Sequence, residues 1–204
     1  MIAIVDYGLG NVHAIANIYK RLDLPCRLAR QAEDFADADH IVLPGVGAFD
    51  WAMARLNSSG MREALDDAVI HRRKPVLGIC VGMQMLAHRS DEGSTAGLGW
   101  IDGEVKHLDP GPAHAPRQLP HMGWNDVKPL DARGLFAGFD QSARFYFLHS
   151  YYFVPHDSAD RLAESDYGAP FACAVRHGHV HGVQFHPEKS HAWGIQLLKN
   201  FAAL

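Results

Sequence analysis

The stretch PVLGICVGMQML, residues 75–86, decides the fold because it joins a buried strand to a helix through one tight turn. PVLGI is a continuous apolar run of strand length, and residues 81–89 have the apolar spacing of a helix. Cys80 stands between the two, flanked by Gly78 and Gly82, in the pattern G-x-nucleophile-x-G of a nucleophile elbow. Side chains at 78 and 82 would collide where strand and helix approach each other, and glycine removes that collision.

The same alternation of strand and helix extends back to the N-terminus. IAIVD (residues 2–6) and HIVLP (residues 40–44) are further apolar runs that predict buried strands. Residues 11–22, 51–56 and 61–72 have the spacing of helices. Strands that alternate with helices predict a parallel sheet with helices on both faces.

Beyond residue 90 the pattern changes, because residues 91–143 are rich in glycine and proline. The remaining elements predicted here are strands at 102–108, 124–129 and 145–154, a hairpin over 174–188 that turns near Gly178, and a C-terminal helix with Ser190 as its N-cap. We therefore expect a single domain, residues 1–204, of class α/β. Its mostly parallel, twisted central sheet is flanked by helices, and a β-rich segment is added to it.

Composition narrows the function classes. The chain has 204 residues, a formal net charge of −4 and no block of lysine or arginine, so nucleic acid is not expected as a partner. No apolar run reaches membrane length and no secretory signal is recognised at the N-terminus, so no membrane association is expected. Three scattered cysteines do not make a disulfide framework, and they fit a reducing compartment. These features predict a soluble, cytoplasmic protein.

Cys80 has two interpretations, a small core residue or a nucleophile. The start of the following helix carries partial positive charge, which favours a thiolate, and the Val81 N–H is a candidate oxyanion donor. A thiolate nucleophile needs a base that an acid orients. QFHPEKS, residues 184–190, offers His186 at a strand end and Glu188 close enough to fix its tautomer. Taken alone, HPE favours an exposed histidine and glutamate at a turn.

Taken together, GICVGMQ and QFHPE, with His186 following Cys80 by 106 residues, resemble the class I (triad) glutamine amidotransferases. The resemblance implies that Cys80 is the nucleophile, His186 the base and Glu188 its orienting acid. It also implies that the PGVG loop, residues 44–47, is the oxyanion strand. The further positions that the resemblance assigns are the oxyanion donors Val46, Gly47 and Val81, and the glutamine-site residues Gly45, Gln84, His149, Ser150 and Tyr151.

Five motifs in order, DYGLGN, PGVGAF, PHMGWN, FLHSYYF and HPEKS, resemble one subfamily, the glutaminase subunits of imidazole glycerol phosphate synthase. That resemblance implies hydrolysis of L-glutamine to glutamate and ammonia through a cysteine thioester, in histidine biosynthesis. It implies a heterodimer in which ammonia passes to a (β/α)8 cyclase subunit, with no cofactor and no metal. Partner contacts are then expected at Trp124, Asn125, Tyr146 and Lys189. The alternative is that Trp124 belongs to the core and Lys189 is merely solvated.

Other interpretations stay open. The chain could be the glutaminase of another synthase, a stand-alone cysteine hydrolase of similar fold, or a non-catalytic binding subunit. A dinucleotide loop at Gly8 and Gly10 lacks its third glycine, because position 13 is histidine. His177, His179 and His181 alternate along a run that could bind metal, but a turn at Gly178 would disrupt the shared face, so a solvated hairpin is favoured.

Overall fold

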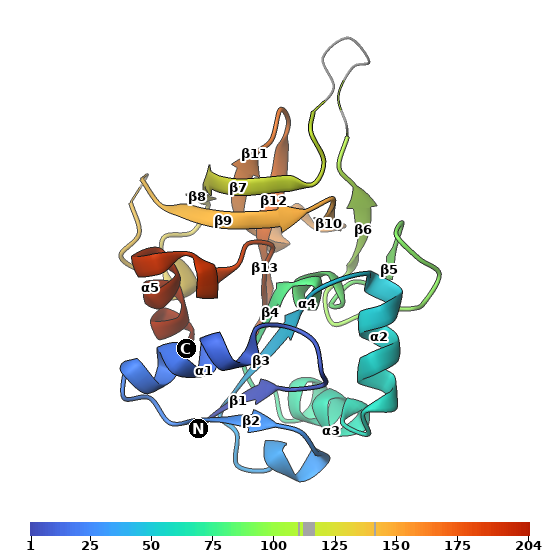
Figure 1. The fold of residues 1–204 in the computed structure, drawn as a ribbon, viewed down its shortest axis with the longest axis vertical. Helices are drawn as coiled ribbons and strands as arrows, with labels where there is room; N and C mark the ends of the chain where they lie inside the picture. The colour runs from blue at the N-terminus through green and yellow to red at the C-terminus, as the bar shows by residue number, and fades with distance from the viewer. Residues whose placement is uncertain (110, 112–116, 141) are drawn as a thin grey trace.

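An eight-stranded mixed sheet forms the centre of the structure (Figure 1). The structure is a computed structural model that describes residues 1–109, 111, 117–140 and 142–204. The strand order of this central sheet is β2-β1-β3-β4-β13-β12-β11-β8. The bounds of these strands are β1 Ile2–Val5, β2 Cys26–Ala29, β3 His40–Gly45, β4 Val76–Cys80, β8 Lys128–Pro129, β11 Arg161–Asp166, β12 Pro170–His177 and β13 Val180–Val183.

The sheet is parallel in its first half and antiparallel in its second. The neighbours from β2 to β13 all run parallel, whereas β12, β11 and β8 continue it antiparallel. All four residues of β1 are buried, as are all five of β4, because helices cover the parallel half on both faces. This confirms the predicted class, a mostly parallel sheet with flanking helices and an added β-rich part.

Two groups of helices flank the sheet. They are α1 Val12–Arg21, α2 Phe49–Ser58, α3 Arg62–Asp66, α4 Val81–Gln84 and α5 His191–Phe201. Figure 1 shows α1 and α5 side by side, with α2 and α3 on the other side of the sheet. In the part of the chain that the structure describes, no helix combines the length and the apolar character needed to cross a bilayer.

The β-rich part includes two small sheets besides the central one. The strands β7 (His121–Asp126) and β9 (Arg144–His149) form an antiparallel ribbon. The other sheet has the order β10-β6-β5, with bounds β10 Tyr151–Pro155, β6 Gly103–His107 and β5 Arg89–Ser90.

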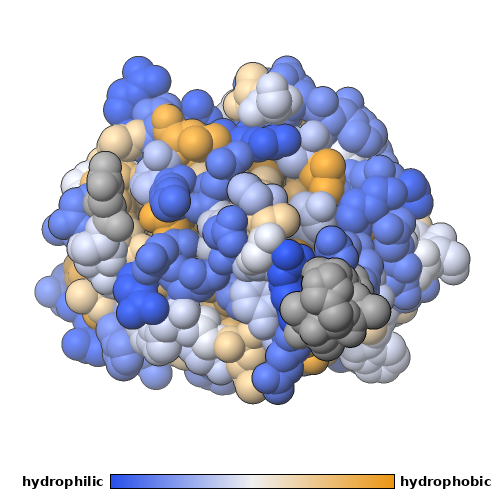
Figure 2. All heavy atoms as spheres, turned by 90° about the horizontal axis from the view of Figure 1, so that it is seen from above, coloured by the Kyte–Doolittle hydropathy of each residue, from blue (hydrophilic) through white to orange (hydrophobic). Residues whose placement is uncertain are grey.

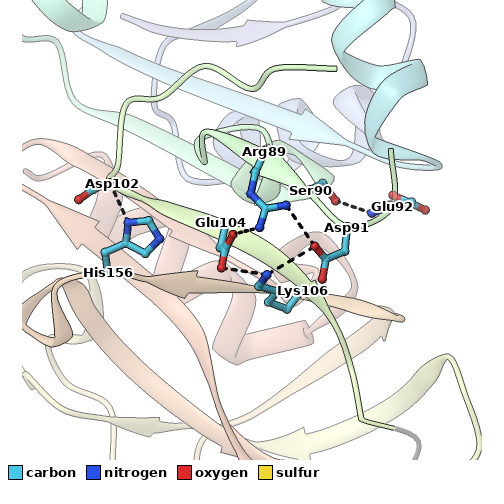
Figure 3. Close-up of polar contacts among 8 residues, drawn as sticks. All are labelled: Arg89, Ser90, Asp91, Glu92, Asp102, Glu104, Lys106 and His156. Carbon is cyan, nitrogen blue, oxygen red and sulfur yellow. Dashed lines mark hydrogen bonds and ion pairs between the residues drawn. The ribbon is translucent and has the colours of Figure 1, made fainter. Parts of the chain in front are cut away.

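An ion-pair network ties β5 to β6 (Figure 3). Glu104 pairs with Arg89 and with Lys106, whose Nζ lies 2.9 Å from its carboxylate, and Asp91 lies 3.5 Å from both cations. Each exposed pair contributes little alone. Together these ion pairs hold the loop that follows β5, which carries Glu92.

Several observed elements differ from the predicted ones, and the strand predicted over 124–129 is divided between β7 and β8, which lie in different sheets. The run 145–154 forms two strands, β9 and β10, which lie in different sheets and are separated at Ser150. The two strands have such similar composition that the sequence does not predict the break. The helix predicted over 81–89 ends at Gln84, because backbone N–H groups of residues 98, 99 and 101 take the carbonyls of residues 85–87. The strand β11, RLAESD, is too polar to have been predicted.

Candidate active site

Cys80 occupies the last position of β4 and the N-cap of α4, with the strained angles φ 55° and ψ −114°. A non-glycine residue in such a conformation costs about 1–3 kcal/mol, which the surrounding contacts must offset. A Cβ on Gly82 would lie 1.9 Å from the carbonyl oxygen of Leu43, and one on Gly78 would lie 2.6 Å from the Gly82 oxygen. Backbone contact therefore requires both glycines: Gly78 where strand and helix approach each other, as the sequence pattern predicts, and Gly82 where α4 passes the neighbouring strand β3.

His186 and Glu188 form a buried pair directly after β13. His186 Nδ1 lies 2.9 Å from Glu188 Oε1, and the two side chains are 4% and 2% exposed. The backbone N–H of His186 donates to the Tyr146 carbonyl at 2.8 Å, which fixes the turn against β9. The Ser190 hydroxyl donates to the His186 carbonyl at 2.6 Å. Ser190 does stand at the N-cap of α5, but its side chain does not cap the helix, because it serves this turn instead.

The charge state of His186 follows from three competing effects. Burial alone lowers its pKa, but its hydrogen bonds and charge interactions with Cys80 and Glu188 outweigh burial and raise the pKa to about 10. Since a carboxylate only accepts, Nδ1 carries the hydrogen shared with Glu188. Nε2 is then the nitrogen left for the sulfur. This arrangement places an imidazole that favours its protonated form beside the Cys80 sulfur.

A cavity of about 300 Å3 opens beside Cys80. Its size and mixed lining suit a small polar molecule. Its lining residues are Val46, Gly47, Cys80, Val81, Gln84, Glu92, Pro120, Leu148, His149, Ser150, Tyr151, His186 and Lys189. Ten of these thirteen are among the residues that the sequence singles out, and Glu92, Pro120 and Leu148 are not.

Gly45 does not belong to the cavity wall. It pairs with Cys80 across the sheet, and a Cβ there would lie 2.6 Å from the Gly82 nitrogen. Gly45 thus packs behind the elbow, whereas Val46 and Gly47 reach the cavity, with Gly47 at φ +85°. The Tyr7 hydroxyl donates to the Pro44 carbonyl at 2.9 Å and anchors the start of this loop.

Two glutamines connect the cavity wall to the sulfur. Gln84 Nε2 donates to the Tyr151 carbonyl at 3.0 Å and to Gln184 Oε1 at 3.1 Å. With both amide hydrogens used, Gln84 can offer only its oxygen to a ligand. Gln184 Nε2 lies 3.8 Å from Cys80 Sγ. Gln184 was not predicted from the sequence, although it stands two positions before His186, and residues two apart share one face of an extended chain.

The mouth of the cavity carries opposite charges. Glu92 and Lys189 both line it. One Glu92 oxygen accepts the Phe49 N–H at 2.8 Å, which ties the loop after β5 to the start of α2. No motif surrounds Glu92, so the sequence held no signal for it. Opposite charges at one opening suit a zwitterionic ligand.

An aromatic and cationic cluster lies on the ribbon β7–β9 near this mouth. The Lys189 ammonium lies 5.6 Å from the ring centre of Tyr146, and Trp124 meets the same ring edge-on at 6.4 Å. Trp124 is 41% exposed, so it is not a core residue. Asn125 points the other way, and its amide donates to the Asp166 carbonyl at 2.7 Å. Of the four residues expected to contact a partner, the structure therefore brings three together: Trp124, Tyr146 and Lys189.

Comparison with known proteins agrees with this geometry. The family described as glutamine amidotransferase class-I matches residues 3–203. A protein of Bdellovibrio bacteriovorus called imidazole glycerol phosphate synthase subunit HisH is 57% identical over 204 residues, covering 100% of both chains. Subunit HisH 2 of Pseudomonas aeruginosa is 45% identical, again over 100% of both.

Solved structures share the fold at lower identity. A crystal structure described as glutamine amidotransferase has a TM-score of 0.76 and 18% identity, covering 100% of this chain and 99% of that one. A chain in the structure of PurLQS from Thermotoga maritima has a TM-score of 0.72 and 17% identity, covering 99% of this chain and 96% of that one. At such identities the likeness concerns the fold alone.

Proposed function

The chain belongs to the class-I glutamine amidotransferase family, and we propose that it is the glutaminase subunit of an imidazole glycerol phosphate synthase. The observation that carries this proposal is the meeting of Cys80, on a strained turn, with the buried His186–Glu188 pair in one cavity. Full-length identity of 57% to a protein with that name supports the assignment. One buried apolar cluster extends from Ile2 to Phe201, which supports a single domain over residues 1–204.

The proposed reaction is acyl transfer to sulfur. The Cys80 thiolate attacks the side-chain carbonyl carbon of glutamine, and the carbonyl electron pair moves to oxygen. Backbone N–H groups of Val81 and of Val46 or Gly47 stabilise this oxyanion. When the C–N bond breaks, His186 gives its Nε2 proton to the departing nitrogen, and ammonia leaves a glutamyl thioester. His186 then takes a proton from water, which attacks the thioester and releases glutamate.

Glutamine recognition follows from the polar groups of the wall. The carboxylate of Glu92 faces the cavity with charge opposite to the α-ammonium group of an amino acid. The free oxygen of Gln84 can accept from the substrate, because its amide hydrogens are already used. The segment His149 to Tyr151 supplies a further part of the cavity wall. We propose that these groups bind L-glutamine and that no cofactor or metal takes part.

We propose that the ribbon β7–β9 docks a (β/α)8 cyclase subunit. Met122, Trp124 and Leu148 are exposed by 62%, 41% and 37%. Figure 2, which views the molecule from the end where this ribbon lies, shows apolar patches within a mainly hydrophilic face. A partner seated over the cavity mouth would receive ammonia before water protonates it. All three cysteines are free, which fits the reducing environment of the cytoplasm.

The test measures glutamate release by the purified chain, alone and with the cyclase and its nucleotide. We expect turnover only in the complete mixture, none with Cys80→Ala, and normal turnover with Cys26→Ser, because Cys26 lies far along the sheet at β2. Equal turnover by the isolated chain would favour a stand-alone hydrolase. Activation by a different synthase would name another partner. Failure of a glutamine-derived electrophile to modify Cys80, even with the cyclase present, would favour a non-catalytic binding protein.

A further inference from the structure

Two buried histidines join the ribbon β7–β9 to the glutamine cavity. His121 and His149 are register partners on the two strands, and His121 Nδ1 lies 2.9 Å from His149 Nε2. The other nitrogen of each ring is also engaged. His121 Nε2 lies 3.2 Å from the Asn125 amide nitrogen, and His149 Nδ1 lies 2.9 Å from the Tyr151 carbonyl oxygen. His121 belongs to the PHMGWN motif, but the proposed reaction gives it no role.

Both ends of this chain of hydrogen bonds fix the direction of every bond in it. The Asn125 amide nitrogen donates to the Asp166 carbonyl at 2.7 Å, while its oxygen accepts the Asp126 N–H at 2.8 Å, so the amide cannot be flipped. That nitrogen therefore donates to His121 Nε2, and a neutral His121 carries its hydrogen on Nδ1. At the far end the Tyr151 carbonyl only accepts, so His149 carries its hydrogen on Nδ1 as well. Each ring then holds one hydrogen in one defined place.

The surroundings keep both imidazole rings uncharged and restrict their rotation. His121 is stacked between Phe147, at 4.7 Å, and Tyr167, at 4.1 Å, with planes within about 22° of parallel. Both imidazoles are buried, which lowers the pKa of His121 to about 4 and that of His149 to about 3. The charge of His186 acts in the same direction on His149. A neutral ring is the form that can stand beside a charged His186.

The chain of hydrogen bonds ends on an atom that also orients the glutamine site. The Tyr151 carbonyl oxygen accepts from His149 and from Gln84 Nε2, at 2.9 and 3.0 Å. Gln84 in turn donates to Gln184, whose amide contacts the Cys80 sulfur. If His149 rotated or changed tautomer, Tyr151 would lose one donor, and the amide of Gln84 would lose its fixed acceptor.

We propose that His121 is a positioning residue for glutamine binding, which holds His149 in a single tautomer and, through the Tyr151 carbonyl, holds Gln84 with its oxygen toward the substrate. This inference rests on the proposed function for its substrate, but the tautomers follow from the hydrogen bonds alone. His121 does not line the cavity, so its effect on the site is carried by His149.

The tautomers are tested first, by two-dimensional long-range 1H–15N spectra of the full chain labelled on histidine, at pH 7. We expect both His121 and His149 as neutral rings protonated on Nδ1. A ring protonated on Nε2, or averaging between tautomers, overturns the proposal. This measurement needs no substrate, so its outcome is independent of whether the chain is a glutaminase.

The effect on the pocket is tested by two electrophiles that modify Cys80. A glutamine-shaped diazoketone must occupy the pocket, whereas iodoacetamide needs only the sulfur. His121→Phe keeps the stack and removes both nitrogens, so we expect labelling by the diazoketone to slow about tenfold and labelling by iodoacetamide to change less than about twofold. His181→Asn is the matched control, because His181 is equally buried but lies on β13, outside this chain of hydrogen bonds, and we expect it to match the wild type.

Asn125→Asp tests the same idea without changing a ring. The aspartate carboxylate accepts where the Asn125 amide donates, so the hydrogen bond between residue 125 and His121 Nε2 changes direction. We expect a shift in the His149 spectrum and the same selective slowing, and this variant decides the matter if His121→Phe does not fold. Diazoketone labelling equal to the wild type in a folded variant refutes the positioning role. A wild-type chain that resists the diazoketone even with the cyclase present would instead count against the proposed function.

Discussion

Replacing Gly82 by alanine should destabilise the protein through one backbone contact. The new methyl group would stand 1.9 Å from the carbonyl oxygen of Leu43 and 2.9 Å from its carbon. Observed Cβ contacts essentially never fall below 3.0 Å, so α4 and β3 must separate by about 1 Å. Neither contact is with a flexible side chain, because both atoms belong to the backbone of Leu43 in the central sheet. The strain therefore cannot be relieved by a rotamer change.

The size of the effect can be bounded from two opposing contributions. Overpacking a dense interior costs about 1–3 kcal/mol, and rigid backbone on both sides places Gly82→Ala at the upper end. Alanine is better than glycine inside a helix by about 1 kcal/mol, which offsets part of that cost. We expect a net loss of about 2 kcal/mol, or a decrease in Tm of roughly 4–8 °C for a chain of this size.

The measurement is urea and thermal denaturation of the purified chain, with Gly60→Ala as control. Gly60 has φ +77° and nothing within 4 Å of the position that a methyl group would take, so alanine there bears only the backbone strain, about 1 kcal/mol. We also expect Gly82→Ala to impair glutaminase activity, since Leu43 leads directly into the oxyanion loop. A Gly82→Ala protein as stable as the wild type would refute the steric account of the elbow.

Three further changes test other parts of the site. Because the pKa of His186 is raised to about 10, its contribution to stability is complete below about pH 6.5 and is lost as the pH rises toward 10. The urea-stability gap between wild type and Glu188→Gln should therefore narrow over that range, and a constant gap would contradict it. The lowered pKa of His121 has the opposite effect on stability, which should fall as the pH drops from about 6.5 to 4. In His121→Phe, unfolding should take up one proton fewer over this range, so stability should depend less on pH. Trp124→Ala should weaken cyclase binding at least about tenfold in calorimetry, whereas Trp51→Ala, exposed on α2, should not.

The elbow and the histidine turn could be predicted because their chemistry is local. Glycines on both sides of Cys80 are needed by the backbone crossing itself, and the sequence states them directly. His186 and Glu188 are two residues apart, so their contact depends on one short turn. The meeting of the two segments follows from the parallel pairing of β4 with β13, which brings their C-terminal ends to one edge.

Other parts of the site depend on contacts between distant segments. Glu92 reaches the cavity because ion pairs hold β5 against β6 and because Phe49 anchors its carboxylate. The run around Ser150 gives no sign of its break, since both strands are apolar and aromatic. Asn125 was expected to face a partner, but strand periodicity turns it inward to Asp166. Alternation places Trp124 and Asn125 on opposite faces of β7, but only the packing of the ribbon decides which face is the inner one.

The same alternation links the two roles of the ribbon. Side chains alternate along a strand, so Met122 and Trp124 face outward on β7 while His121 and Asn125 face inward. The outward residues form the proposed docking face, and the inward ones begin the hydrogen bonds that end at the Tyr151 carbonyl. A partner that shifts β7 by pressing on its outer side must move the inner side with it. The strand proposed to bind the cyclase is therefore the same strand that sets the orientation of the glutamine pocket.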